Sequence, residues 1–383
     1  MREFKFCLLV MVAVAGLLLG GCGGDDETYI IPYGGKFLYV NNDSDANAVS
    51  AFRIRANGTL EEIAGSPFAT GGAGSLGGFY AANKIAIARS KKLLFASNAD
   101  DNTISVFKIN AITGELTPVG EPVANSSVAG MGSSGSLAVD DGENFLFVGN
   151  DNDDTVSVFS IAVNGALTAV AGSPFGIGAF GVDGLALNAK GNGLYIAAPD
   201  SNQIVVMSVA ADGTLTPIPG SPFDYTGVGN VYSFVLGSST MGLAGASDGV
   251  SGGTISSYGI DAIGAPTLLD SLSIGAGGNS QAVSTARRGT LAFLSGGDFW
   301  TDTNQISVLQ VASDGTLTPV IGSPFATDWR TSGYAVANFT GRYLYVTEED
   351  QVEAFRIDRA GGLTSIDVDV LTNPGFATGA VIY

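Results

Sequence analysis

The chain has 383 residues, of which 45% are hydrophobic, 14% are charged and 55 are glycines. This composition excludes a disordered or coiled-coil protein and favours a turn-rich β protein with a large core. The formal net charge is -19, histidine is absent and acids are spread along the whole chain. We therefore expect a protein that repels nucleic acid and anionic lipid headgroups and that is kept soluble in an extracytoplasmic space.

The first 21 residues are typical of an export signal. Arg2 and Lys5 precede an apolar run over residues 6–19, which is too short and wrongly flanked for a membrane-spanning helix. Cys7 leaves with this signal. Since the sequence holds only two cysteines, we expect no disulfide and no thiol chemistry in the mature domain.

The segment that follows, Leu19-Gly20-Gly21-Cys22, resembles the lipobox of bacterial lipoproteins. The resemblance implies cleavage before Cys22, lipidation of this cysteine and residues 22–35 as a lipidated tether. Two or three acyl chains meet the requirement for a stable membrane anchor, and Gly23 fits sorting to the outer membrane, on the periplasmic or the cell-surface side. The alternative is an ordinary signal peptide with a cysteine near its cleavage site.

Residues 36–383 repeat one pattern seven times, with a period of roughly 50 residues. Each copy holds an apolar strand, an Asn/Asp-rich loop, a second apolar strand, a glycine turn and a short strand like Leu-Thr-Pro. The first strand is anchored by residues 38–40, 94–96, 146–148, 194–196, 242–244, 291–293 and 344–346. In the second strand, apolar columns such as those of Val49 and Phe52 are an odd number of positions apart, so both faces of each sheet are buried, as in stacked blades.

Glycines close a hairpin into the outer strand of every copy, as at Asn57-Gly58. Gly-Ser-Pro-Phe follows the outer strand in four copies, and we expect its phenylalanine to fill the gap between neighbouring blades. Six copies also have an inner strand, at residues 85–87, 137–139, 185–187, 234–236, 282–284 and 334–336. The first copy lacks one and residues 379–383 supply it, which predicts an all-β, seven-bladed propeller of four-stranded antiparallel blades, closed by the C-terminal strand.

The motifs Leu-Tyr-Val-x-Asn, Val-Ser-Val-Phe-x-Ile, Gly-x-Leu-Thr-Pro-Val and Gly-Ser-Pro-Phe resemble those of the lactonase-type seven-bladed β-propeller family, which includes 6-phosphogluconolactonase. The resemblance covers residues 36–383 and implies lactone hydrolysis or formation at one mouth of the central channel. Family members often carry Pro-Arg-His just before an inner strand. The matching positions in this chain are Asn83-Lys84, Gly135-Ser136, Asp183-Gly184, Ser280-Gln281 and Ser332-Gly333.

Only Lys84 keeps a positive charge among these positions, so the resemblance makes Lys84 and Asp183 the catalytic candidates and Asn83 and Gln281 ligand-binding candidates. Without histidine, the base that activates water would have to be a carboxylate with a raised pKa. A phosphorylated sugar lactone does not suit a domain outside the cytoplasm.

Three further features have two interpretations each. The Asn/Asp-rich loops at residues 41–45, 98–102, 150–154 and 298–304 offer oxygen ligands for calcium, but their spacing favours turn chemistry, and we expect no metal and no cofactor. Arg89, Arg287 and Arg288 form either a small basic patch or, as we favour, solvated turns opposite the functional mouth. Phe299, Trp300 and Trp329 either pack between blades or stack a sugar or peptide.

Two functional hypotheses remain. The first is a membrane-anchored extracytoplasmic propeller that binds a small molecule or a protein, or has a structural role, because histidine and free thiols are missing. The alternative is a lactonase-like hydrolase or isomerase for a sugar or muconate-type lactone, with a carboxylate base at the channel mouth.

Overall fold

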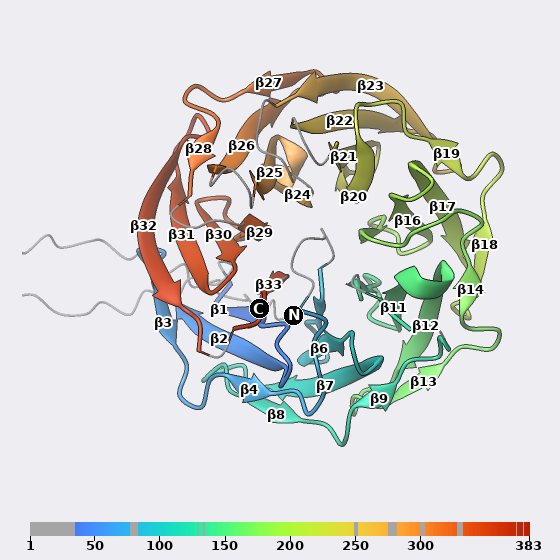
Figure 1. Cartoon of the computed structure of the whole chain (residues 1–383), viewed down its shortest axis with the longest axis vertical. Helices are drawn as coiled ribbons and strands as arrows, with labels where there is room; N and C mark the ends of the chain where they lie inside the picture. Colours follow the sequence, from blue (N-terminus) through green and yellow to red (C-terminus); the bar gives the residue numbers. More distant parts are fainter. Residues whose placement is uncertain are drawn as a thin grey trace, which may run out of the picture. The chain divides into compact units, whose positions relative to one another are not determined.

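The computed structural model describes residues 35–76, 83–128, 130–132, 135–248, 252–274, 282–298, 303–327, 332–372, 374–377 and 379–383, with the backbone alone at 296–298, 303–304 and 332. They belong to one compact unit, Pro32–Tyr383, and the predicted signal and Cys22 lie outside them. Within this unit, seven antiparallel sheets surround a central axis (Figure 1). No helix in these ranges is long and apolar enough to cross a bilayer.

The first four blades follow one another around the axis; in each, four strands run in order from the inside outward, and a short fifth strand, given last, pairs with the third. Blade 1 contains β33 (Ala380–Ile382), β1 (Phe37–Asn41), β2 (Ala48–Ile54), β3 (Leu60–Glu62) and β4 (Phe68–Ala69). Blade 2 contains β5 (Ile85–Ala88), β6 (Leu93–Asn98), β7 (Thr103–Ile109), β8 (Leu116–Pro118) and β9 (Val123–Ala124). Blade 3 contains β10 (Leu137–Val139), β11 (Phe145–Asn150), the 3-10 turn η1 (Asp151–Asp153), β12 (Thr155–Ile161), β13 (Leu167–Ala169) and β14 (Phe175–Gly176). Blade 4 contains β15 (Leu185–Leu187), β16 (Gly193–Ala198), β17 (Gln203–Val209), β18 (Leu215–Pro217) and β19 (Phe223–Asp224).

The remaining three blades complete the ring. Blade 5 contains β20 (Asn230–Ser238), β21 (Met241–Ser247), β22 (Gly253–Ile260) and β23 (Pro266–Ser273). Blade 6 contains β24 (Ala282–Ala286), the 3-10 turn η2 (Arg287–Gly289), β25 (Leu291–Asp298), β26 (Thr303–Val311), β27 (Leu317–Pro319) and β28 (Phe325–Ala326). Blade 7 contains β29 (Ser332–Ala337), β30 (Tyr343–Glu348), β31 (Gln351–Ile357) and β32 (Leu363–Val370).

Ring closure by the C-terminal strand is confirmed. β33 pairs antiparallel with β1, with Leu38 opposite Ile382 and Val40 opposite Ala380. The inner strands contact one another in ring order, and β33 lies between β29 of blade 7 and β5 of blade 2. Blade 1 is thus assembled from both ends of the propeller sequence, which leaves no open edge between the first and the last blade.

The core lies between blades, as the sequence columns predict. One buried cluster joins Phe37 and Tyr39 of blade 1 to Leu94 of blade 2, and other clusters join other neighbouring blades in the same way. Tyr195 adds a polar link, because its hydroxyl donates to the Gly264 carbonyl of the next blade over 2.9 Å. Both faces of the sheets are therefore buried, which a two-layer sandwich would not achieve.

The Gly-Ser-Pro-Phe motif builds a part of the blade that the sequence did not predict. In blade 1, the Ser66 hydroxyl accepts the Ala51 amide of the third strand over 3.0 Å, and Phe68 then pairs with Val49. The four predicted strands form the ordered path of every blade, and in five of the seven sheets a two-residue fifth strand also pairs with the third strand. Phe68 packs against the cluster between blades 1 and 2, as expected of a residue that fills the gap between blades.

The anchor predicted for blade 6, residues 291–293, is wrong by one position. Phe293 pairs with Val308, as Tyr39 pairs with Ala51 in blade 1, so the anchor is residues 292–294. Leu291, Phe293 and Leu294 are all buried and apolar. The hydrophobic pattern therefore did not distinguish the two registers.

Strand direction gives the propeller two different ends. The inner and third strands begin, and the second strands end, on what we call the mouth face. The opposite end, the hairpin face, carries the turns from inner to second strand and the glycine hairpins from third to fourth strand. Side chains far apart in sequence meet on each of these faces because every blade repeats the same direction of travel.

Candidate functional site at the mouth face

The start of each inner strand is the part of the mouth face closest to the axis. Backbone hydrogen bonds join the starts of some neighbouring inner strands. The Leu137 amide donates to the Asn83 carbonyl over 2.9 Å, and the Gly184 amide donates to the Tyr232 carbonyl over 3.0 Å. The positions that the family resemblance selected in blades 2 to 4 consequently lie close around one mouth.

Lys84 forms a buried ion pair just before β5. Its Nζ donates to Asp43 Oδ2 and to Ser75 Oγ, each over 2.7 Å, and neither Lys84 nor Asp43 is exposed. Asp43 Oδ1 also accepts the Ser75 amide over 2.9 Å. The Asp43 backbone has φ 50°, in the left-handed region, and the Asn41 side chain accepts the Asp43 amide over 3.2 Å, which supports this conformation. The loop between β1 and β2 thus brings a carboxylate to the lysine of the next blade.

Asp183 lies just before β15 and is 2% exposed. Burial raises its pKa well above the ordinary value, the Asp151 carboxylate raises it further, Lys84 lowers it, and Asp200 raises it. A carboxyl group in this setting holds its proton to a higher pH than a solvated aspartate, as a general base that also returns a proton must do.

Asp151, in the 3-10 turn η1 after β11, lies next to this group and is half-buried. Burial raises the pKa of Asp151, the Val182 amide that it accepts over 3.2 Å lowers it, and Asp200 and Asp154 raise it. The pKa values of Asp183 and Asp151 are thus both raised by neighbouring carboxylates, and Lys84 acts on Asp183 in the opposite direction. Neighbouring like charges disfavour the ionised form of a buried carboxyl group.

Two buried polar atoms of the mouth lack a hydrogen-bond partner among the described residues: Asn83 Oδ1 and Ser136 Oγ. Ser136 is 1% exposed and precedes β10, at the position that Lys84 occupies in blade 2. Buried polar atoms are nearly always hydrogen-bonded, so these two atoms are available to a ligand or a water molecule.

The Asn/Asp-rich loops are occupied with structural hydrogen bonds. The Asn98 amide donates to Thr103 and Ser105, and Asn150 donates to Thr155 and Ser157 in the same way. No three Asp or Glu carboxylates in the described ranges gather closely enough to hold a metal ion. The amides of these loops therefore hold neighbouring strands together at the mouth face.

The structure places Lys84, Asp183 and Asn83 at one mouth, whereas Gln281, Phe299, Trp300 and Trp329 lie outside the described residues. The sequence analysis did not single out the Asp43 partner of Lys84 or the carboxyl groups of Asp151 and Asp200. Each of these three aspartates lies one or two positions after the end of a second strand, where the Asp/Asn-rich loops begin. This position is the sequence signal that could have identified them.

The family model for "Lactonase, 7-bladed beta-propeller" matches residues 30–129, which include blades 1 and 2. No curated protein matches the sequence. Among solved structures, a candidate 6-phosphogluconolactonase from Bacteroides fragilis is similar, with a TM-score of 0.72 and 16% identity over 94% of this chain and 100% of that chain.

The periplasmic gluconolactonase PpgL of Pseudomonas aeruginosa is similar with a TM-score of 0.71 and 14% identity over 91% of this chain and 99% of that chain. A hypothetical selenium-binding protein from Sulfolobus tokodaii shares the fold at 7% identity and a TM-score of 0.66, over 91% of this chain and 94% of that chain. At these identities the structural likeness establishes the fold alone. By the sequence of its first two blades and by its fold, this chain resembles the lactonase-type seven-bladed β-propeller family.

Proposed function

We propose that the chain hydrolyses a lactone at the mouth face, with Asp183 as the general base. The observation that carries this proposal is the buried Asp183 carboxyl, whose pKa is raised by burial and by Asp151 and lowered by the buried Lys84. It supplies the carboxylate base that a histidine-free lactonase requires. The family match over residues 30–129 and the gluconolactonase of similar fold support the same reaction class.

Asp183 alone can carry out both proton transfers of lactone hydrolysis. Ionised Asp183 takes a proton from water as the water oxygen bonds to the acyl carbon, and the ring C–O bond then breaks. The protonated carboxyl returns the proton to the ring oxygen, giving an open hydroxy acid. Lys84 acts through Asp183, because its buried charge lowers the pKa that burial raises, and the Ser136 hydroxyl, which has no partner among the described residues, would donate to the carbonyl oxygen.

The charges of the mouth face select against anionic substrates. Asp43, Asp100, Asp151, Asp183 and Asp200 lie on this face, and Lys84 is its sole Lys or Arg within the described ranges. Among the described residues, a sugar phosphate lactone or a dicarboxylic muconolactone would meet net negative charge and no cation free of a carboxylate partner. We therefore expect an uncharged sugar lactone as the substrate.

The test is a lactone panel on the purified mature chain, with uncatalysed ring opening subtracted. Asp183→Asn should lower kcat/KM for an uncharged lactone by roughly 10²- to 10⁴-fold. The matched control is Asp212→Asn, an exposed aspartate of the β17–β18 turn on the hairpin face of the same blade, which should retain full activity. Because the base must be ionised, the wild-type rate should rise with pH through the raised pKa of Asp183. A preference for the phosphorylated lactone would contradict the substrate class, and equal activity of both variants would contradict the role of Asp183.

A binding or structural role is the second candidate, and one observation favours it: Asp183 is 2% exposed and Lys84 is not exposed at all. If substrate and water never reach these two side chains, the charges of Asp183 and Lys84 contribute to the stability of the fold and not to catalysis. Inactivity of the wild-type chain towards the whole panel would favour this role over hydrolysis.

We also propose that Cys22 is lipidated and that the propeller is anchored to the cell envelope. The support is the Leu19-Gly20-Gly21-Cys22 sequence, together with the periplasmic location named for the similar Pseudomonas aeruginosa protein. Mass spectrometry of the N-terminal peptide from cell membranes should find an acylated residue 22, and an unmodified Cys22 would refute the anchor.

A further inference from the structure

Positive charges lie almost entirely at one end of the propeller. Every described Lys and Arg except Lys84 lies in a turn, a hairpin or a strand end of the hairpin face. The net charge of -19 for the whole chain conceals this separation, because the acids of the mouth face outweigh it. The mouth face is therefore acidic and the hairpin face holds nearly all the described bases, so the two ends interact differently with a charged surface.

On the hairpin face, the bases gather over blades 6, 7, 1 and 2, which are neighbours in the ring. We call this region the basic crescent and define it by Lys36, Arg89, Lys92, Arg288, Arg342 and Arg359, all of them exposed. The hairpins of these four blades also carry Glu61, Glu115, Asp314 and Asp358, but bases outnumber acids there, whereas on the same face of blades 3 to 5 Lys190 is the sole described base, beside Asp141, Glu143, Asp212 and Asp261.

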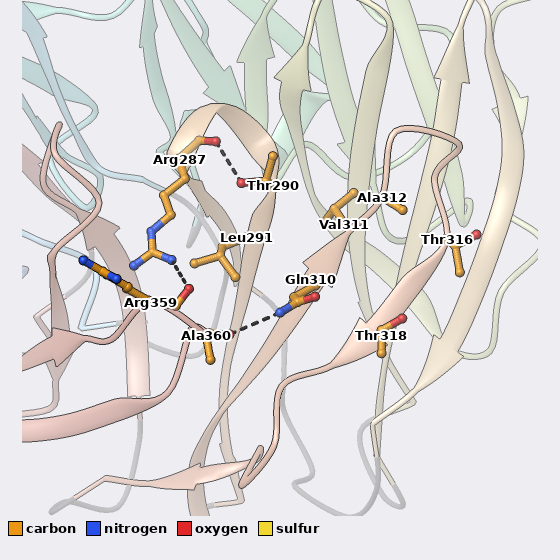
Figure 2. Close-up of a pocket in the computed structure, with 10 residues that line it drawn as sticks. All are labelled: Arg287, Thr290, Leu291, Gln310, Val311, Ala312, Thr316, Thr318, Arg359 and Ala360. Carbon is orange, nitrogen blue, oxygen red and sulfur yellow. Dashed lines mark hydrogen bonds between the residues drawn. The ribbon is translucent and has the colours of Figure 1, made fainter.

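Arg287 joins blades 6 and 7 of the crescent. Its guanidinium donates to the carbonyls of Gly341 over 3.2 Å, Arg359 over 3.0 Å and Asp358, so β24 of blade 6 is tied to two turns of blade 7. It is therefore not the solvated turn residue that the sequence suggested. Arg287 and Arg359 line one side of a cavity of about 260 Å³, with Thr316 and Thr318 on the other (Figure 2). Because the Arg287 guanidinium is already bound to three carbonyls, its role on this face is to hold blades 6 and 7 together.

The propeller sequence also begins inside the crescent. β1 starts on the hairpin face, and the amide of Lys36 just before it donates to the Tyr383 carbonyl over 2.7 Å. Gly35 lies against Phe339 of blade 7, and the Arg89 guanidinium of blade 2 lies 4.4 Å from the centre of the Phe339 ring. The 13 residues from Cys22 to residue 34 span at most roughly 45 Å when extended. A tether that leaves from this point brings the crescent, and not the mouth face, closest to its anchor.

We propose that the basic crescent docks on the anionic surface of a lipid bilayer, so that the mouth face points away from the membrane. Two observations support a bilayer as the partner of the crescent. The bases of the crescent complement anionic headgroups, and the propeller sequence begins on the same face. Attraction of this kind acts within a Debye length of about 8 Å at physiological salt and adds up over neighbouring Lys and Arg residues. The tether argument rests on the proposed lipidation of Cys22, whereas the charge argument rests on neither lipidation nor catalysis, and the test uses the unlipidated chain.

The first experiment measures sedimentation of the unlipidated mature chain, which carries Cys22→Ser, with vesicles. Binding should be seen with vesicles that contain 30% phosphatidylglycerol, should be absent with pure phosphatidylcholine, and should be lost at 1 M salt. Arg342→Gln should weaken binding about fivefold, and Lys92→Gln/Arg342→Gln/Arg359→Gln by roughly 10²-fold. The matched control is Lys190→Gln, an exposed base in the corresponding turn of blade 4, which should bind like the wild type.

Three outcomes would overturn the proposal. Equal loss of binding in Arg342→Gln and Lys190→Gln would mean that net charge acts rather than the crescent, and absence of binding to anionic vesicles at low salt would mean that no docking occurs. Tighter retention on duplex DNA than on anionic vesicles at the same salt would assign the crescent to nucleic acid instead.

A second experiment reports the orientation. Since both cysteines of the sequence precede the propeller, a fluorophore can be placed on Ala360→Cys in the crescent or on Val128→Cys at the mouth face. On anionic vesicles, quenchers in the bilayer should quench the label at position 360 several-fold more than the label at position 128. Equal quenching, or the reverse order, would refute the orientation.

Discussion

The buried pair of Lys84 and Asp43 is the most sensitive electrostatic contact of the mouth. Its Nζ–Oδ2 distance is 2.7 Å and both side chains are fully buried. At an effective dielectric constant of 20, this distance corresponds to an attraction of about 6 kcal/mol, which offsets the cost of removing two charges from water. When Lys84 is replaced, Asp43 stays buried and charged without a partner and keeps its own desolvation cost. Lys84→Met should therefore lower the free energy of unfolding by about 3–5 kcal/mol.

The assay is urea unfolding at pH 7, followed by intrinsic fluorescence, for the wild type, Lys84→Met, Asp43→Asn and the double variant. Since the double variant leaves no unpaired charge, it should be at least about 2 kcal/mol more stable than the sum of the single effects predicts. Lys190→Met, which removes an exposed lysine, should change stability by less than about 0.5 kcal/mol. A loss below about 1 kcal/mol for Lys84→Met, or strictly additive effects, would refute the reasoning.

Three further predictions concern the ring and its outer strands. Tyr195→Phe removes the 2.9 Å hydrogen bond to Gly264 of the next blade and should cost about 1 kcal/mol in urea unfolding; Phe147, at the equivalent place in blade 3, shows that the site accepts a phenyl ring, and a neutral result would contradict the estimate. Deletion of residues 380–383 removes the pairing of β33 with β1 and should lower Tm and expose apolar edges that bind a hydrophobic dye, whereas an unchanged Tm would contradict closure. Burial raises the pKa of Asp369 to about 6, so the contribution of Asp369 to stability should be full below about pH 4, fall as pH rises to about 6 and then level off; the difference in unfolding free energy between the wild type and Asp369→Asn should change over this pH range, and a difference independent of pH would exclude the raised pKa.

Much of the fold was predictable because each blade encodes its own strands and turns. The columns of Val49 and Phe52 show a sheet buried on both faces, and the glycines after the third strand fix the hairpins. The blade 6 anchor was misplaced because Leu291, Phe293 and Leu294 are all apolar, so the local pattern carried no information about the register. The fifth strand was missed because Ser66 satisfies the Ala51 amide with a side-chain oxygen, a bond that no strand pattern signals.

The candidate site was less accessible to prediction. Lys84 and Asp183 were selected because of their place before an inner strand, but their partners come from loops of other repeats. Asp43 is 41 residues from Lys84 in sequence, and the loop that holds Asp43 resembles several other Asn/Asp-rich loops. The basic crescent was also hidden, because a net charge and a list of charged residues do not show at which end of a strand each residue lies.

The sequence by itself determined the number of blades, their strand order and the strand that closes the ring. These follow from short-range patterns, since a sheet that is apolar on both faces can only be buried by a similar sheet on each side. Only the tertiary structure decided which charges meet: Lys84 with Asp43, Asp183 with Asp151, and the bases of blades 6, 7, 1 and 2 around Gly35. The physical reason is that electrostatic interactions depend on distance in space, and in a closed ring that distance is set by strand direction and by the joining of the two chain ends.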